Sequence, residues 1–392
     1  MDEIRKKALK YSVNAALFCV FLEAVYLFFM YASGTYSSDF PAHIYASITG
    51  EGYSLMHLIL KICNKISPHP LITAYVMGII TVATVYAVYC FLKFILKENN
   101  VKFNKYMVMA LGITGICLSS IYIPKLFPHH YTAATCLTQP WHNTTYILMR
   151  MLGYLTLTVY FYIVRNYQKK NCIKAYVVFT IFLSLTNFAK PNFFLGFAPM
   201  MLAVLIYDFI KSRGKQLKNI IMFGCCVLLS MPVLFMQARE VYGEGENSSV
   251  IFSCEKFKQL YSGTDWIWAA VSNMLFPVIV TGVVIYAKKK NGEIDISYLV
   301  QAWIMYFISY GEMLFIQETG ARASHGNFAW GIYFFTAVLY IICLAEWIII
   351  YKKEYLSKKN PLFFIGTAVY CMNAASGIQY VCLLTQGKHY II

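Results

Sequence analysis

Charged residues are scarce in this sequence. Asp, Glu, Lys and Arg make up 13% of the 392 residues, whereas soluble domains carry about 25%. Acidic residues are the scarcer kind, with 18 Asp and Glu against 33 Lys and Arg. Because 59% of the residues are hydrophobic, the chain has too little polar surface to coat a soluble fold. These proportions exclude a soluble protein and predict an integral membrane protein.

The motifs of soluble nucleotide-dependent and zinc-dependent enzymes are also missing. The sequence has no P-loop, no dinucleotide-binding glycine fingerprint, no zinc-binding helix and no nucleophile elbow. The 12 cysteines include no pair with metal-ligand spacing. A soluble nucleotide-using enzyme is therefore excluded, and we expect no cofactor.

Long apolar runs make up most of the chain. Eleven such runs follow one another, and most reach the roughly 20 residues that cross a bilayer core. They lie at 10–32, 71–96, 106–123, 146–164, 174–188, 193–210, 219–238, 266–287, 297–316, 328–350 and 362–384. We predict an all-α, polytopic fold with eleven transmembrane helices in a single membrane domain, residues 1–392.

Basic residues are concentrated in every other loop. Six alternate loops hold 23 of the 33 Lys and Arg residues, and basic loops face the cytoplasm. We therefore predict a multi-pass protein of the cell membrane with its N-terminus inside and its C-terminus outside. The net charge of +15 reports topology and attraction to anionic membrane lipids, and it does not indicate nucleic acid.

The first predicted outer loop, residues 33–70, contains an amphipathic segment at 54–66. We expect its polar stripe (Ser54, His57, Lys61, Asn64 and Lys65) to face away from its apolar stripe (Leu55, Ile59, Ile62 and Ile66). Thirteen residues are too few to span a membrane. The pattern predicts a helix that lies flat in the outer interface.

Asp39 and His43 open the same loop. They are four residues apart, so they share a face if the segment is helical. A carboxylate there can act as a general base or a metal ligand. Alternatively, Ser38 or Asp39 caps a helix that has Pro41 in its first turn.

The second predicted outer loop carries His142, and Arg150 follows just inside the next span. Both can bind an anionic headgroup. The pair His129-His130 is interpreted as a solvated part of the same loop, and Asn143-Thr144-Thr145 matches a glycosylation sequon.

The fifth and sixth apolar runs are short and meet at Lys190-Pro191. Proline stops one helix and can start the next, so we predict a hairpin whose tip barely reaches the outer surface. Lys190 would then lie near the hydrocarbon boundary, where a cation needs a phosphate or carboxylate partner.

The fifth predicted outer loop is dense in polar groups. Arg322 and His325 can take a diphosphate through charge-assisted hydrogen bonds. Glu312 lies about a turn inside the preceding span, where ionisable groups are costly and often functional. The alternative is an Arg322–Glu318 ion pair, four residues apart, that only orders the loop.

Together these features resemble the GT-C superfamily of membrane glycosyltransferases, over the whole length of the chain. The match consists of a lone acid after the first helix (Asp39), an amphipathic helix in the same loop (54–66), a Lys-Pro-Asn junction (Lys190, Pro191 and Asn192) and later cationic loops (His142, Arg150, Arg322 and His325). Many relatives carry paired acids in the first loop, whereas here the next acid, Glu51, lies twelve residues on. We therefore expect no metal.

The resemblance implies an inverting transfer of a sugar from a polyprenyl-phosphate carrier to a glycan or lipid acceptor on the outer face. Asp39 would deprotonate the acceptor hydroxyl. Lys190, Arg322 and Arg150 would hold the carrier phosphate. His43, His142, Asn192, Glu312, Glu318 and His325 would complete the substrate site.

Three other classes stay open. A polymerase or ligase of lipid-linked polysaccharide also uses outer-face Arg and His, but it usually has one dominant outer loop. A transporter or flippase often has two related halves with broken helices at matching positions, whereas only one Lys-Pro break is visible here. The third class is a membrane-embedded assembly protein.

Overall fold

The computed structural model describes residues 2–123, 141–242, 248–255, 258, 265–292, 294–323 and 326–388. Within these ranges the chain forms thirteen α-helices, a 3₁₀ turn (Gly320–Arg322) and a two-stranded sheet. The helices are α1 (Asp2–Ala32), α2 (Phe40–Thr49), α3 (Leu55–Ile66), α4 (Pro70–Glu98), α5 (Lys105–Cys117), α6 (Thr144–Asn166), α7 (Ile173–Ala189), α8 (Asn192–Lys211), α9 (Leu217–Tyr242), α11 (Asp265–Asn291), α12 (Ser297–Phe315), α13 (Ala329–Lys352) and α14 (Pro361–Thr385).

Local signals in the sequence start several of these helices. The side chains of Asn104, Asn143 and Asn360 accept hydrogen bonds from backbone N–H groups in the first turns of α5, α6 and α14. Such caps satisfy donors that a helix start otherwise leaves free. Pro70 and Pro361 occupy the opening turns of α4 and α14, where a missing N–H costs nothing.

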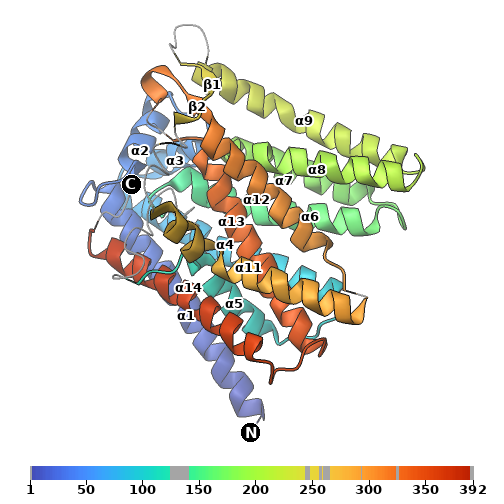
Figure 1. The fold of residues 1–392 in the computed structure, drawn as a ribbon. Helices are drawn as coiled ribbons and strands as arrows, with labels where there is room; N and C mark the ends of the chain where they lie inside the picture. Colours follow the sequence, from blue (N-terminus) through green and yellow to red (C-terminus); the bar gives the residue numbers. More distant parts are fainter. Residues whose placement is uncertain are drawn as a thin grey trace.

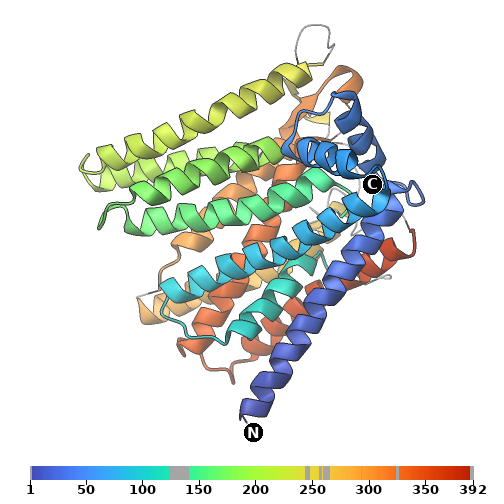
Figure 2. The same ribbon diagram turned by 180° about the vertical axis from the view of Figure 1, so that it is seen from behind.

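Eight of the helices are long and apolar enough to cross a membrane: α1, α4, α6, α8, α9, α11, α13 and α14. The other three predicted spans coincide with α5, α7 and α12, which do not meet the same criterion of length and hydropathy. The two chain ends lie at opposite ends of the bundle (Figures 1 and 2), as an odd number of crossings requires. The polytopic helical class is therefore found, while the count of eleven spans and the orientation stay predictions.

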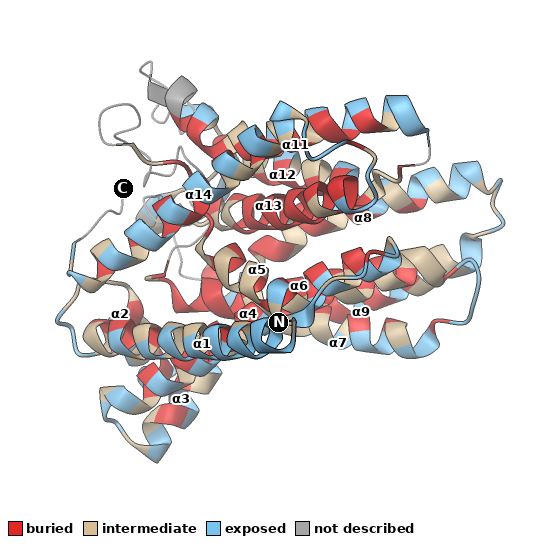
Figure 3. Cartoon of the chain, turned by 90° about the horizontal axis from the view of Figure 1, so that it is seen from below, coloured by how far each residue is buried: buried red, intermediate tan, exposed pale blue. Residues whose placement is uncertain are grey.

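Helix α13 forms the centre of the bundle. Of its most apolar 18-residue window, 89% is buried, against 22% for α1 and 17% for α9. Figure 3 shows α13 enclosed by its neighbours, with the exposed residues of α1 on the outside. The exposed faces of α1 and α9 carry large apolar side chains such as Phe18 and Phe235, which suit lipid.

The third predicted span differs from the prediction. Helix α5 ends at Cys117, Leu118 is extended, and residues 118–123 continue outside any helix instead of completing one to 123. This segment packs against α11 and α14. Ser119 N–H donates to Asn373 O, Ile121 N–H to Ser272 O and Tyr122 N–H to the Ser376 hydroxyl. Non-helical backbone inside a membrane bundle requires such internal partners.

The predicted amphipathic helix is present as α3, with Ser54 as its N-cap, but the predicted division of its faces is wrong. His57 is buried with Met56, Leu60 and Cys63, whereas Ile66 is 71% exposed. The reason is that His57 has hydrogen-bond partners inside the protein, so a polar side chain lies on the packed face.

The predicted hairpin is also present: α7 ends at Ala189 and α8 begins at Asn192, with Lys190 and Pro191 between them. The all-α expectation needs one small correction. Strands β1 (Val250–Phe252) and β2 (Ile316–Glu318) pair antiparallel, with Ile251 opposite Gln317. This sheet lies at the same end of the bundle as α2 and α3 (Figure 1).

Candidate functional site

Asp39 precedes α2, but its side chain does not cap that helix. The cap is supplied by the Ser38 hydroxyl, which accepts from Phe40 N–H. The Asp39 Oδ2 atom instead accepts a hydrogen bond from Asn143 Nδ2 at 2.7 Å and lies 3.4 Å from His43 Nε2. Asp39 Oδ1 is buried and has no hydrogen-bond partner among the described residues. The carboxylate is therefore directed into a cluster of side chains rather than at its own helix.

A second set of hydrogen bonds connects Asp39 to Lys190. Asn143 donates to Asp39 through Nδ2 and accepts from the Thr145 hydroxyl through Oδ1 at 2.8 Å. Thr145 Oγ1 in turn accepts from Lys190 Nζ at 3.0 Å. Asn143 is 4% exposed, so in the folded chain it is a structural link and not an accessible sequon. We call Asp39, His43, His57, Asn143, Thr145 and Lys190 the Asp39 cluster.

Lys190 sits at the tip of the α7–α8 hairpin. Its Nζ lies 4.3 Å from the centre of the Trp330 ring, a cation–π contact. Burial lowers the pKa of Lys190 to about 8, although the negative charge of Asp39 opposes this shift. The hairpin thus places a partly desolvated cation within electrostatic reach of the Asp39 carboxylate, with Thr145 as its hydrogen-bond partner.

The charge state of Asp39 reflects opposing influences. Burial would raise its pKa, but the hydrogen bond from His43 and the positive charges of His142 and Lys190 outweigh it and hold the pKa below its ordinary value. Asp39 is therefore an ionised carboxylate at neutral pH. One of its oxygen atoms is without a partner in the described part of the chain.

Glu318 and Arg322 form the ion pair that the alternative interpretation predicted, with Arg322 Nε 3.1 Å from Glu318 Oε1. Glu318 is 4% exposed and also accepts from Tyr242 OH and from Asn327 Nδ2. Asn327 O accepts from Asn192 Nδ2 at 2.7 Å. This group therefore ties β2 to the starts of α8 and α13, and Asn192 has a structural partner there.

Arg322 also interacts electrostatically with Tyr53, in the first predicted outer loop. Its charge acts on Lys190. The His142 ring lies 6.0 Å from Trp330, the ring that Lys190 contacts. Arg322 and His142 thus border the Asp39 cluster. His325 and the pair His129-His130 lie outside the described residues.

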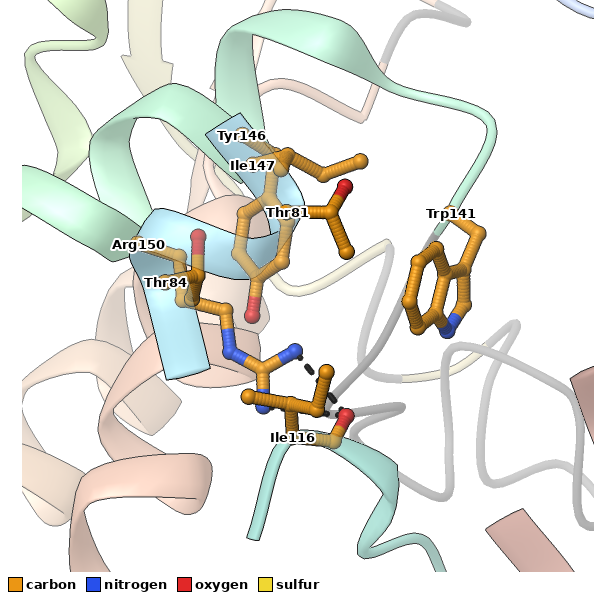
Figure 4. A pocket seen from close by; sticks show the side chains of 7 residues that line it. All are labelled: Thr81, Thr84, Ile116, Trp141, Tyr146, Ile147 and Arg150. Atoms are coloured by element: carbon orange, nitrogen blue, oxygen red, sulfur yellow. Dashed lines mark hydrogen bonds between the residues drawn. The ribbon is translucent and has the colours of Figure 1, made fainter. Parts of the chain in front are cut away.

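Arg150 has a different position from the one predicted. Its guanidinium donates to Ile116 O and Gly115 O, each at 3.3 Å, and these carbonyls end helix α5. Arg150 is 4% exposed and lines a small pocket with Trp141 and Tyr146 (Figure 4). A cation at a helix C-terminus stabilises the free carbonyls and the helix dipole. Its geometry gives Arg150 a structural task, and its phosphate-binding role stays a prediction.

Glu312 lies in α12, close to the start of α13. A side chain at Gly331 would come within 3.4 Å of Glu312 Oε2 and 3.3 Å of Asn192 O, so these groups pack closely around a glycine. Glu312 Oε2 is buried and without a hydrogen-bond partner among the described residues. The carboxyl group is next to Asn192, in the same region of the bundle as the Lys190 hairpin.

No group of three His, Cys, Asp or Glu side chains that could hold a metal ion occurs in the described ranges. Comparisons with family models, with curated proteins and with solved structures found no match for this chain. The candidate site therefore rests on its own geometry.

The Asp39 cluster includes side chains that sequence reasoning did not assign to a site. Asn143 and Thr145 were visible as part of a sequon, and His57 as part of the polar stripe of the amphipathic segment. A useful signal was available for Asn143, because an Asn before an apolar helical run is a common N-cap. No sequence signal points to its contact with Asp39, 104 residues away.

Proposed function

We propose that the chain is an inverting membrane glycosyltransferase. It would move a sugar from a polyprenyl-phosphate carrier to a hydroxyl of a glycan or lipid acceptor, on the outer face of the cell membrane. The observation that carries the proposal is the Asp39 cluster. In it an ionised carboxylate, one of whose oxygens is buried and has no partner among the described residues, interacts electrostatically with a desolvated lysine. The resemblance of the sequence to the GT-C superfamily supports the same conclusion.

The chemistry needs two groups of opposite charge at one place. A general base removes the acceptor proton, and a cation stabilises the phosphate that departs with the bonding electrons. Asp39 suits the first role, because a buried acceptor atom without a partner favours a hydroxyl donor. Lys190 suits the second, since an ammonium has three donors and only one is directed at Thr145. Arg322 and His142 border the same place and would contact the carrier diphosphate or sugar.

The test is transfer from radiolabelled polyprenyl-phosphate sugars by the purified protein in lipid nanodiscs. We expect Asp39→Asn to lower the rate by about 10²- to 10⁴-fold, the usual contribution of a general base. Glu51→Gln is the matched control, because Glu51 is an exposed acid in the same loop, and it should leave the rate unchanged. Full activity of Asp39→Asn would remove this residue from the mechanism and direct attention to Glu312.

A second candidate is a transporter or flippase of lipid-linked sugars. The observation that favours it is the interrupted α5, which continues as the non-helical segment 118–123 inside the bundle. Discontinuous helices are typical of transporters. Movement of an intact labelled lipid-linked sugar across a proteoliposome bilayer, without cleavage, would support this candidate and contradict the transferase.

A further inference from the structure

A line of close polar contacts runs from the start of α3 to Asp39. Ser54 N–H donates to His57 Nδ1 at 3.2 Å, and the Ser54 hydroxyl lies 2.8 Å from the same atom. His57 Nε2 lies 3.0 Å from His43 Nδ1, and His43 Nε2 lies 3.4 Å from Asp39 Oδ2. The line joins α3, α2 and the residue before α2.

The backbone N–H of Ser54 fixes the proton positions along this line. It can only donate, so His57 Nδ1 must accept and the neutral ring carries its proton on Nε2. His57 Nε2–H then donates to His43 Nδ1, and His43 in turn carries its proton on Nε2, facing Asp39. Adding a proton to either ring would place two N–H groups against each other. Both imidazoles are therefore neutral, with His57 donating to His43 and His43 donating to Asp39.

Both ring nitrogens of His43 are occupied, so His43 cannot itself take a proton from a substrate. Asp39 Oδ2 is occupied as well, by His43 and Asn143. The remaining atom is Asp39 Oδ1, which has no partner among the described residues. We propose that Ser54, His57 and His43 form a positioning chain that holds His43 as a neutral hydrogen-bond donor to Asp39 Oδ2, so that Oδ1 is the atom that accepts the substrate proton.

This inference rests on the proposed function for its catalytic meaning. The acceptor O–H bond breaks, and its proton moves to Asp39 Oδ1. The oxygen lone pair forms a bond to the anomeric carbon, and the bond from that carbon to the carrier phosphate breaks with its electrons on the phosphate. During this reaction His43 and His57 keep their protons. His57 donates to His43, and His43 donates to the carboxylate and orients it.

The surroundings favour neutral imidazoles. Burial, with the positive charge of Lys190, lowers the pKa of His57 to about 4. Around Asp39 the titratable neighbours are Tyr31 on α1, His43 on α2, His142 before α6 and Lys190 after α7. A side chain at Gly52 would come within 2.5 Å of the His57 ring, so the glycine allows the loop to pack closely against this ring and restrict its orientation.

Nitrogen-15 NMR of histidine-labelled protein in nanodiscs tests the chain without any substrate. Signals of His43 and His57 are assigned from their loss in His43→Gln and His57→Gln. We expect both rings to be neutral at pH 7, with the proton on Nε2. A charged His43 at pH 7, or a ring with its proton on Nδ1, would contradict the proposed positioning chain, whether or not the protein transfers sugar.

The catalytic role is tested by the pH dependence of kcat/KM. His43→Ala removes an interaction that lowers the Asp39 pKa, so the acidic limb of the variant's kcat/KM profile should move to higher pH. The maximal kcat/KM should fall by about tenfold to a hundredfold. His43→Gln should restore most of the rate, because its amide N–H can donate to Asp39.

His57→Phe removes the group that donates to His43 Nδ1, so it should lower kcat/KM. His57→Gln should restore most of the loss, because its amide N–H can donate to His43, and His69→Gln, at an exposed histidine outside the positioning chain, is the control. A wild-type pH profile in His43→Ala, together with wild-type kcat/KM in His57→Phe, would refute the positioning role. If NMR finds both rings neutral with the proton on Nε2, and the protein transfers sugar from no donor, the positioning chain is confirmed and the transferase proposal fails.

Discussion

Lys190 is a cation held where its charge depends on pH near neutrality. Its ammonium contacts the Trp330 ring and the Thr145 hydroxyl, and burial brings its pKa to about 8. The charge of Lys190 is therefore present below about pH 8 and lost above it. A phosphate bound by Lys190 would be held less tightly in alkaline solution.

This yields a prediction for the KM of a polyprenyl-phosphate donor. We expect the KM to rise as the pH passes about 8, because the neutral amine no longer attracts the phosphate. In Lys190→Arg the KM should not rise within the pH range of the assay, because a guanidinium stays charged there. The measurement is KM against pH for the two proteins, with Lys61→Arg on the exposed face of α3 as control. An unchanged rise in Lys190→Arg would mean that another group is titrating.

Asn143 makes one contact that its sequence context predicts and another that it does not. Its Oδ1 caps α6 at Tyr146 N–H and accepts from Thr145, while its Nδ2 donates to Asp39. The first contact is local and predictable. The second depends on two segments that are 104 residues apart meeting in space. The residue was thus visible as a sequon, while its place beside the candidate base was not.

Among the elements, α5 is the one that departs most from its sequence pattern. The apolar run continues to 123, but the helix stops at Cys117 because Arg150 satisfies the carbonyls of Gly115 and Ile116. Hydropathy cannot distinguish a buried helix from a buried non-helical segment, since both are apolar. The partners that make the non-helical form stable come from α6, α11 and α14.

We therefore predict that Arg150→Gln lowers the stability of the fold by about 1–3 kcal/mol, because buried carbonyls lose their donors. The donor KM should change little. Thermal unfolding in detergent, together with donor kinetics, measures both quantities, and Lys218→Gln at an exposed position is the control. If Arg150→Gln had wild-type stability and a donor KM raised more than tenfold, Arg150 would instead be a ligand of the donor phosphate.

For the whole molecule, the alternating charge of the loops predicts which end of the bundle faces outward. The predicted basic loops gather at one end, and α2, α3 and the sheet lie at the other (Figure 2). The Asp39 cluster lies at the end with α2 and α3. By the positive-inside rule we predict that this end faces outward.

A membrane-impermeant maleimide applied to intact cells checks this orientation. The protein should have its exposed native cysteines replaced by serine. We expect Glu51→Cys to be labelled from outside and Lys289→Cys to be labelled only after the membrane is opened. The reverse pattern would place the Asp39 cluster in the cytoplasm and rule out an outer-face enzyme.

The sequence by itself determined the features that depend on neighbours along the chain. Each apolar run predicted a segment that contains a helix, although α5 ends at Cys117 and not at 123. Helical periodicity predicted α3, and Pro191 predicted the α7–α8 hairpin. These signals are local, because lipid burial, helix periodicity and caps involve residues within a few turns of each other.

Only the tertiary structure decided which polar residues belong together. It joined Asp39 to Asn143 and Lys190 to Trp330, placed His57 on the packed face of α3 and directed Arg150 to the end of α5. Each of these contacts joins segments that are far apart in the sequence or turns a side chain against its expected face. Their stability comes from packing of the whole bundle, and a one-dimensional pattern carries no information about it.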